Sequence, residues 1–447
     1  MRTSKTLAFF TIALASAACG DDGGLSGDDT PDPDGPTPDV GPGVIEILEG
    51  DIATDQTWTA NNTYILKGYV FVTGGTLTIT KNGKINAVGT AVAPIIFTSS
   101  QQGPPAPGDW GGIVLLGKAT INVTGGINAI EGFASSFGDR VIYGAPTGTA
   151  NDAHDCGKLK YARIQYAGFQ LSAANELNGL TIGGCGSATE IDFVQSHLGQ
   201  DDGIEVFGGT VNLKHLVISD SDDDGLDWDL GWVGKAQFVI VKQKDGRGDK
   251  GFEADNHPNA FDNLPRSAPE IWNATLVGGN GLLASKKQGG MHLRRGTAGK
   301  ISNVIVLGFN QFAIDIDGAN SVTQLNTGVD GTVATPDDAL FVNHSYFQAA
   351  AAQPLYSAGF DAPNGTSNDA NGVDEEVLFG AVARNGHVQN PMLTDPTNVT
   401  LPNFKPLAGS PVLTGCGTPS AGLDTTATYC GAIGADDWTA GWTAYPL

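Results

Sequence analysis

The chain is poor in basic residues, in methionine and in long apolar runs. It has 24 Lys and Arg against 48 Asp and Glu, which gives a formal charge of −24 at pH 7. This balance argues against a nucleic-acid-binding protein, because such proteins neutralise phosphates with Lys and Arg. Three Met and 63 Gly among 447 residues argue against a helical protein, since Gly destabilises helix interiors. Apolar residues still make up 40% of the chain, which is enough to form a core.

Cysteine is also scarce, and no two of the five Cys have the CxxC spacing typical of zinc sites. Once Cys19 is set aside, the remaining four are Cys156, Cys185, Cys416 and Cys430. An even number in an exported chain predicts two disulfides. The economical pairing is Cys156–Cys185 and Cys416–Cys430, although the sequence alone allows three pairings.

The first residues have the pattern of an export signal. Arg2 and Lys5 precede an apolar run from Leu7 to Ala18, which is too short to cross a bilayer. The run ends at Cys19 and resembles a bacterial lipoprotein signal, in which the Cys becomes the lipidated N-terminus. The alternative is an ordinary secretory signal cut near Ala18. We therefore expect residues 1–19 to be a signal peptide and Cys19 to anchor an exported protein to the outer membrane or cell surface.

Residues 20–43 are rich in Asp, Pro and Gly and contain almost nothing that could be buried. Such a composition predicts a solvated, disordered tether. No later stretch of the chain reaches 18 apolar residues, so we expect contact with a membrane only through the lipid anchor. Residues 44–447 are then left as the folded domain.

Two kinds of short segment alternate between about residues 158 and 318. In both kinds the second and fourth residues are apolar or small, as in a strand with one buried face. The first kind comprises Tyr161–Ile164, Phe193–Ser196, His215–Ile218, Phe238–Val241, Asn273–Leu276 and Asn303–Val306. The second kind comprises Gly179–Ile182, Gly203–Val206, Gly225–Trp228, Gly251–Ala254, Gly290–Leu293 and Ala313–Ile316.

The second kind recurs at intervals of 24, 22, 26, 39 and 23 residues. A β-unit at this spacing, with an occasional insertion, predicts a solenoid. Two strands per repeat and frequent Gly turns favour an all-β, right-handed parallel β-helix over a propeller, whose blades need about 40–45 residues. The long interval predicts a loop at residues 256–268, and inward residues such as Ile204, Leu226 and Phe252 should stack into the core.

Several sequence segments resemble those of a known family. They are Gly108–Gly117, Leu159–Gly168, Phe207–His215 and Gly434–Trp442. With the early strands around Gly75–Ser99, they resemble a large family of uncharacterised bacterial surface lipoproteins with a pectate-lyase-like β-helix. The resemblance covers roughly residues 44–447. It implies a β-helix at the cell surface and no established reaction.

Charged residues should form one outward row on the second kind of strand. The row comprises Glu205, Asp227 with Asp229, Glu253 with Asp255, His292 with Arg294, and Asp315 with Asp317. Because successive coils lie about 4.8 Å apart, stacked carboxylates repel one another. Calcium, which takes several oxygen ligands, would relieve this repulsion. The cationic residues His292, Arg294 and Arg295 would do the same beside Glu253 and Asp255, and these five form a candidate ligand-binding group.

The turn Asp220–Gly225 matches the first half of a DxDxDG calcium loop. Position 12 of that loop is Gly231 instead of Glu, so the motif is not an EF-hand. We expect a calcium site built from Asp201, Asp202, Glu205, Asp220, Asp222, Asp224 and Asp227. The alternative is a set of solvated Asp residues in turns.

Three functions remain open. The first is a surface protein that binds a polysaccharide or another envelope component, and exposed aromatic residues such as Trp232 could stack on its sugar rings. The second is a calcium-dependent polysaccharide lyase or a glycoside hydrolase, with Asp202, Asp227, Asp229 and Arg294 as candidate catalytic residues. The third is a passive structural protein. No P-loop is present, and we expect no nucleotide or redox cofactor.

Overall fold

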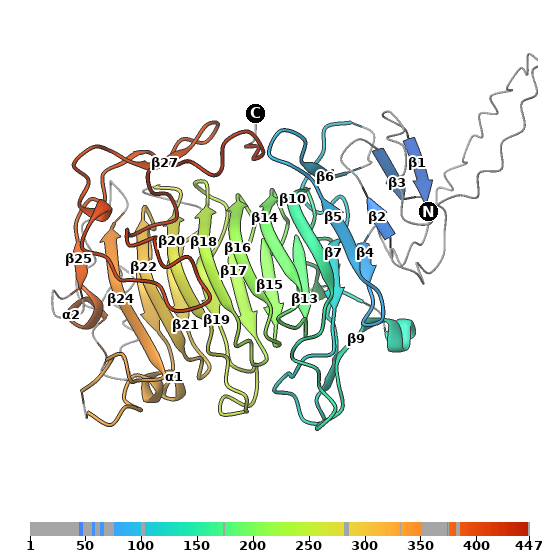
Figure 1. The fold of residues 1–447 in the computed structure, drawn as a ribbon, viewed down its shortest axis with the longest axis horizontal. Helices are drawn as coiled ribbons and strands as arrows, with labels where there is room; N and C mark the ends of the chain where they lie inside the picture. The colour runs from blue at the N-terminus through green and yellow to red at the C-terminus, as the bar shows by residue number, and fades with distance from the viewer. Residues whose placement is uncertain are drawn as a thin grey trace, which may run out of the picture. The chain divides into compact units, whose positions relative to one another are not determined.

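The computed structural model describes most of the chain after residue 43. The described ranges are 44–47, 56–58, 63–66, 76–99, 103–133, 135–172, 175–280, 286–330, 332–349, 373, 375–380 and 385–445. All of them belong to one unit, Pro42–Leu447. The expected signal peptide, Cys19 and the tether lie outside the described residues. Within these ranges the chain forms two long parallel sheets, in which successive strands stack side by side in chain order (Figure 1).

The first sheet has eleven strands. They are β2 (Gln56–Trp58), β5 (Ile85–Val88), β6 (Ile95–Phe97), β10 (Gly157–Gln165), β14 (Glu190–His197), β16 (Asn212–Ser219), β18 (Lys235–Lys242), β20 (Glu270–Val277), β22 (Gly299–Leu307), β24 (Leu340–Gln348) and β25 (Gly386–Val388). The second sheet has eight strands. They are β4 (Thr76–Ile79), β7 (Gly112–Leu116), β13 (Leu180–Gly183), β15 (Ile204–Phe207), β17 (Leu226–Asp229), β19 (Lys250–Ala254), β21 (Gly289–Leu293) and β23 (Phe312–Ile316).

Smaller elements lie outside the two long sheets. The paired short strands are β1 (Val44–Ile47) with β3 (Thr63–Leu66), β8 (Ile127–Ala129) with β9 (Ile142–Gly144), β11 (Gln170–Ser172) with β12 (Asn175–Glu176), and β26 (Leu393–Asp395) with β27 (Asn403–Pro406). The helices are α1 (Ala319–Gln324), α2 (Glu375–Phe379) and the 3₁₀ turns Ser135–Val141 and Pro411–Leu413.

The chain visits the two long sheets alternately from β13 to β24, so each coil adds one parallel strand to each sheet. This is a parallel β-helix, and it confirms the predicted fold. The inward residues predicted from the repeat, Ile204, Leu226, Phe252, Met291 and Ile314, are each 0% exposed. They stack in the interior with residues of the eleven-stranded sheet, including Val239 and Leu276.

Each long strand of the eleven-stranded sheet bends at one residue with a left-handed backbone. This corner row comprises Tyr161, Phe193, His215, Phe238, Asn273, Asn303 and His344, with φ between 46° and 62°. Non-glycine residues rarely adopt this conformation, although Asn and His tolerate it best. Stacking offsets part of the cost. The ring centroids are 4.3 Å apart for Tyr161 and Phe193, 4.1 Å for Phe193 and His215, and 4.9 Å for His215 and Phe238.

A C-terminal strap, residues 389–445, covers the strand halves beyond the corner row. Apolar strap residues such as Val412 and Trp442 pack on Val217, Ile240 and Ile305. These strand halves are therefore buried on both faces, which explains their nearly continuous apolar sequence.

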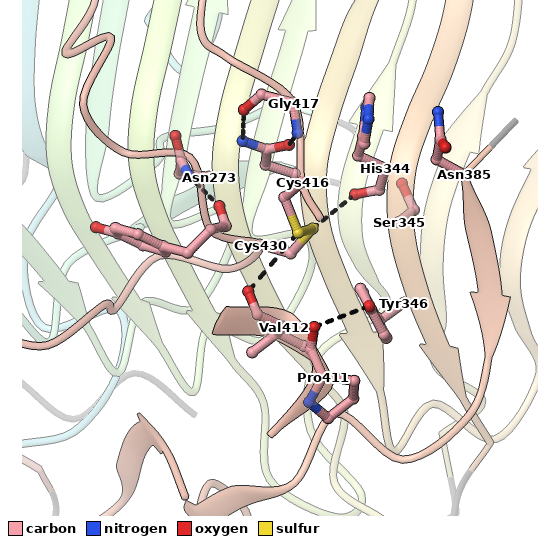
Figure 2. Close-up of a disulfide and its surroundings, with 12 residues drawn as sticks. Asn273, His344, Ser345, Tyr346, Asn385, Pro411, Val412, Cys416, Gly417 and Cys430 are labelled. Atoms are coloured by element: carbon pink, nitrogen blue, oxygen red, sulfur yellow. Dashed lines mark hydrogen bonds between the residues drawn. A yellow bond between two sulfur atoms is a disulfide. The ribbon is translucent and has the colours of Figure 1, made fainter. Parts of the chain in front are cut away.

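Side-chain amides of the sheet hold the main chain of the strap. Asn273 donates to the carbonyl oxygen of Tyr429 at 2.6 Å, and Asn303 donates to that of Gly417 at 2.8 Å (Figure 2). The Tyr346 hydroxyl donates to the carbonyl oxygen of Pro411 at 3.1 Å. Polar residues at and beside the corner row therefore donate hydrogen bonds to carbonyl groups of the strap that packing alone would leave without a partner.

Both predicted disulfides are present, Cys156–Cys185 between neighbouring coils and Cys416–Cys430 within the strap (Figure 2). The first closes a loop across 29 residues. Replacing Cys156 and Cys185 together by Ala should lower the free energy of unfolding by about 3 kcal/mol in the chain-entropy model. Urea unfolding of the variant checks this, and an unchanged midpoint would contradict it.

Candidate functional site

The outward residues of the eight-stranded sheet form the row that the repeat predicted. Strand pairing places Glu205 beside Asp227, Asp227 beside Glu253, Glu253 beside His292, and His292 beside Asp315. Three carboxylates therefore occupy three successive coils before any basic side chain appears in the row. Like charges directly opposite one another destabilise a sheet, so this row needs a compensating charge.

Glycine at the start of four of these strands, those that carry Glu205, Asp227, Glu253 and His292, permits their close approach. A Cβ atom on Gly225 would lie 2.5 Å from the carbonyl oxygen of Gly251, and one on Gly251 would lie 2.5 Å from that of Gly290. Larger residues at these positions would push the coils apart. The backbone thus fixes the distance between neighbouring coils, and only side-chain rotation can change the distances between the carboxylates of the row.

The turns just before these strands add a second set of carboxylates. The Asp224 N–H donates to Asp202 Oδ1 at 2.8 Å, and the Lys250 N–H donates to Asp224 Oδ1 at 2.5 Å. Each carboxylate is therefore tied to the backbone of the next coil. Asp202 and Asp224 are 6% and 4% exposed, so the hydrogen bonds orient them inside the structure.

Four triplets of carboxylates have ligand oxygens within 4.8 Å of one another. They are Asp201–Asp202–Asp223, Asp202–Glu205–Asp227, Asp223–Asp224–Asp249 and Asp224–Asp227–Glu253. Basic side chains accompany three of them. Lys286 Nζ lies 3.7 Å from Asp223, Lys250 Nζ lies 2.7 Å from Asp249, and Arg294 pairs with Glu253. Asp202, Glu205 and Asp227, here called the central triplet, form no ion pair with a basic side chain of the described ranges.

A buried amide supports the central triplet. Asn178 is 0% exposed, and its Nδ2 donates to Glu205 Oε2 at 2.6 Å. Its Oδ1 is buried without a hydrogen-bond partner among the described residues, as is Asp227 Oδ1. Buried acceptors without a donor are costly, so both oxygens favour a ligand that donates hydrogen bonds or carries positive charge.

The carboxylates of this region have strongly perturbed acidity. Burial, and then the neighbouring carboxylates, raise the pKa values of Asp202, Glu205 and Asp227 well above their usual range. The same causes raise the pKa of Asp201 to about 8 and that of Asp229 to about 7. Near neutral pH the cluster therefore favours bound protons or another cation over full ionisation.

The opposite end of the row is compensated by protein cations. Arg294 bonds Glu253 and lies 2.8 Å from Asp255, and Arg295 lies 2.7 Å from Asp255. His292 Nδ1 is 3.6 Å from Glu253. Burial opposes protonation of His292, but the nearby carboxylates of Asp317 and Glu253 outweigh it and raise its pKa.

A cleft of about 270 Å³ opens over this row. Its lining residues are Asn128, Ala129, Glu131, Tyr143, Glu205, Phe207, Asp227, Asp229, Leu230, Asp255, Pro258, Arg294 and Arg295. One wall comes from the β8–β9 region and the other from the loop that follows Asp255. Asn122 Nδ2 donates to Asn256 Oδ1 at 2.9 Å, and Asn256 in turn holds the backbone of Phe261. This bridge links the segment before β8 to the loop that follows Asp255.

The outer face of the eleven-stranded sheet provides a contrast within the same chain. Before the corner row, several of its charged residues pair with an opposite charge on a neighbouring coil. Lys158 lies 3.0 Å from Glu190, and Lys160 lies 3.1 Å from Asp192. Lys235 lies 3.2 Å from a carboxylate of β20. Opposite charges on neighbouring coils stabilise this sheet, whereas the described residues place no basic partner beside the central triplet of the other sheet.

The structure brings together most of the predicted ligands. Asp201, Asp202, Glu205, Asp224 and Asp227 all belong to the triplets. Asp220 and Asp222 do not belong to any of the four triplets, and each has a basic partner. Buried Asp220 lies 3.4 Å from Lys242, and Asp222 lies 3.6 Å from Arg247.

The other predicted residues fall around the cleft. Of the candidate catalytic residues, Asp227, Asp229 and Arg294 line it, and Asp202 completes the central triplet. The candidate ligand-binding residues Glu253, Asp255, His292, Arg294 and Arg295 form the compensated end. The prediction of Trp232 as an exposed sugar platform is wrong, because Trp232 is 0% exposed and donates to the carbonyl oxygen of Val211.

Four residues of the site were not predicted from the sequence. They are Asp223, Asp249, Glu131 and Asn178. Asp223 lies in the same acidic turn as Asp222, and Asp249 precedes a strand as Asp201 and Asp223 do, so the repeat carried a signal for both. Asn178 occupies the position of Asp202 and Asp224 one coil earlier. Glu131 lies on a loop far outside the repeat, where no periodic signal exists.

A protein-family model described as a pectate-lyase-like β-helix domain matches residues 75–371 of the chain. No curated protein and no solved structure matches it.

Proposed function

This chain belongs to the pectate-lyase-like β-helix family, and on that premise we propose that it is an exported surface protein that binds a polysaccharide or another envelope component in its cleft. We further propose that Ca²⁺ occupies the central triplet when no other ligand is bound. The observation that carries both proposals is the central triplet, three carboxylates on adjacent coils without a basic partner among the described residues.

Calcium suits the central triplet for two reasons. Its ligands are oxygens only, and Ca²⁺ takes 6–8 oxygens at about 2.3–2.6 Å. Two oxygens on opposite sides of such an ion lie up to about 5 Å apart, which agrees with a triplet whose oxygens are within 4.8 Å of one another. Magnesium suits it less well, because Mg²⁺ requires near-ideal octahedral geometry, keeps several of its waters and is usually held by only one or two carboxylates.

A saccharide suits the cleft because polar and apolar groups converge there. Asn128 and Arg295 offer hydrogen-bond donors, the carboxylates offer acceptors, and Leu230 and Pro258 offer apolar contact. A few placed polar groups on a partly apolar wall are typical of small-ligand sites.

One observation favours an enzyme as the second candidate. Glu131 and Glu205 both line the cleft, and burial, followed by the charge of the neighbouring Glu131, raises the pKa of the Glu205 carboxyl well above its usual range. A carboxylic acid that keeps its proton near neutral pH can serve as a general acid, as glycoside hydrolysis requires. A calcium-dependent lyase or a glycoside hydrolase would release new sugar ends, whereas a binding protein would not.

A panel of purified polysaccharides, with and without EDTA, separates these functions. We expect binding of at least one polymer without release of reducing or unsaturated ends. Asp227→Asn should weaken that binding at least tenfold. Glu190→Gln, on the outer face of the eleven-stranded sheet, should leave the binding unchanged. Release of ends that stops in Asp227→Asn would establish the enzyme instead, and a panel without binding would contradict both.

Export and anchoring are proposed from the N-terminal sequence alone. Among the described residues no helix is long and apolar enough to span a membrane. Replacing Cys19 by Ala should move the protein from the membrane fraction into the soluble fraction, because the lipidated residue would be lost. Wild-type protein that is already soluble and starts at another residue would contradict the lipid anchor.

A further inference from the structure

We propose that the saccharide bound in the cleft carries primary amines, and that an ammonium group of the ligand takes the place of the metal ion at the central triplet. This inference rests on the proposed function, because it uses the same cleft. It goes further by naming the chemical class of the ligand, an amino-sugar polymer whose amino groups are not acetylated.

The charge of the cleft points to a cationic ligand. Its lining contains five carboxylates, Glu131, Glu205, Asp227, Asp229 and Asp255, against the two cations Arg294 and Arg295. Both arginines are already engaged by Asp255, and Arg294 also by Glu253. An acidic polymer would meet net repulsion here.

The geometry of the central triplet fits an ammonium group. An ammonium has three N–H donors and makes charge-assisted bonds of about 2.8 Å to carboxylate oxygens. At tetrahedral angles the three acceptor oxygens then lie about 4.6 Å apart. The triplet's oxygens lie within 4.8 Å of one another, and they come from three side chains, one for each donor.

Two buried acceptors support the same ligand class. Asn178 Oδ1 and Asp227 Oδ1 are both buried and without a hydrogen-bond partner in the described part of the chain. The Asn178 side chain is directed at the triplet, since its Nδ2 holds Glu205. A ligand that brings several donors satisfies such oxygens, whereas an acetylated amine keeps only one N–H and no charge.

The size of the cleft and the charge of the chain agree with a polymer of which one sugar ring binds in the cleft. A cleft of about 270 Å³ is slightly smaller than the roughly 300–1,000 Å³ that holds drug-sized ligands, so it suits about one sugar ring. The formal charge of −24 attracts polycations over longer distances and speeds their encounter. Specific binding must therefore be distinguished from this general attraction.

Calorimetric titration with a short oligosaccharide of glucosamine tests the proposal, at physiological salt and in metal-free buffer. The N-acetylated oligosaccharide of equal length serves as the comparison ligand. We expect the glucosamine oligomer to bind at least 30-fold more tightly than the acetylated one. Saturating Ca²⁺ should weaken its apparent affinity, because both ligands need the central triplet.

Three variants localise the binding. Asp227→Asn and Glu205→Gln should each weaken binding at least tenfold. Glu190→Gln removes the same charge from the outer face of the eleven-stranded sheet, and it should change the affinity less than twofold. Thermal melts of all three establish that each is folded.

Three results would overturn the proposal. Equal weakening in all three variants would reveal general charge attraction. Binding of spermidine as tight as that of the glucosamine oligomer would reveal a site that recognises the amine without recognising the sugar. Equal or tighter binding of the acetylated or an acidic oligosaccharide, lost in Asp227→Asn, would refute the ligand class while leaving the proposed function intact.

Discussion

Calcium should raise the free energy of unfolding by about 4 kcal/mol when its free concentration is about 1,000 times its dissociation constant. Sodium at the same ionic strength should not, because screening acts weakly on buried charges. The gain arises at the central triplet, where the ion replaces repulsion among Asp202, Glu205 and Asp227 with coordination. Urea unfolding in EDTA and in millimolar Ca²⁺ measures the difference.

Two variants distinguish coordination from surface screening. Asp227→Asn should remove most of the calcium increment, because it removes one charge of the central triplet. Asp222→Asn should keep the increment, because Asp222 lies beside Arg247 and outside the triplets. Equal stabilisation by Ca²⁺ and Na⁺, or loss of the increment in Asp222→Asn instead, would contradict the site.

In calcium-free buffer the protein should lose stability as the pH rises from about 5 to 8, by on the order of 4 kcal/mol. The pKa of Asp201 is raised to about 8 and that of Asp229 to about 7, far above the value of about 3.9 for an unfolded Asp. In this window the folded state binds more protons than the unfolded state, so alkali favours unfolding. The raised pKa of His292 contributes with the same sign.

Urea unfolding at several pH values measures this slope, and two variants assign it. Asp229→Asn should flatten the slope, because the variant side chain does not titrate. Asp192→Asn provides the opposite case. Burial raises the pKa of Asp192, but the hydrogen bond from His215 and the contact with Lys160 outweigh it, so the pKa is lowered. The Asp192 carboxylate stabilises the folded state at neutral pH, and this contribution is lost as the pH falls through its lowered pKa. A stability that rises between pH 5 and 8 in metal-free wild type would contradict the acidic cluster.

The β-helix could be predicted from the sequence because its repeat is periodic. The period-two pattern placed Leu226 and Phe252 inside and Asp227 and Glu253 outside, as strand pairing confirms. The bend at the corner row was missed, although each segment of the first kind begins at its corner residue. A left-handed backbone at Phe193 or His215 leaves no local signal, since the stacking that stabilises it joins residues on different coils.

Which charged residues form ion pairs was harder to predict than which of them lie in one row on a sheet. Lys242 and Asp220 lie on adjacent coils, 22 positions apart, and only the fold brings them into a buried pair. Asp220 therefore lies outside the four acidic triplets. The C-terminal strap was missed for a similar reason, because Asn273 and Tyr429 are 156 positions apart and no repeat relates them. Contacts within the repeat are readable from sequence, whereas contacts outside it depend on tertiary packing.

Calorimetric titration of metal-free protein with Ca²⁺ tests the central claim most directly, that the central triplet is a cation site. Wild type and Asp222→Asn should each bind about one ion per chain at this site, since Ca²⁺ needs clustered oxygens and, of the four acidic triplets among the described residues, the central one has no basic partner there. Asp227→Asn should bind none there. Wild type that takes up no calcium, or Asp227→Asn that binds it as tightly as wild type, would contradict the claim.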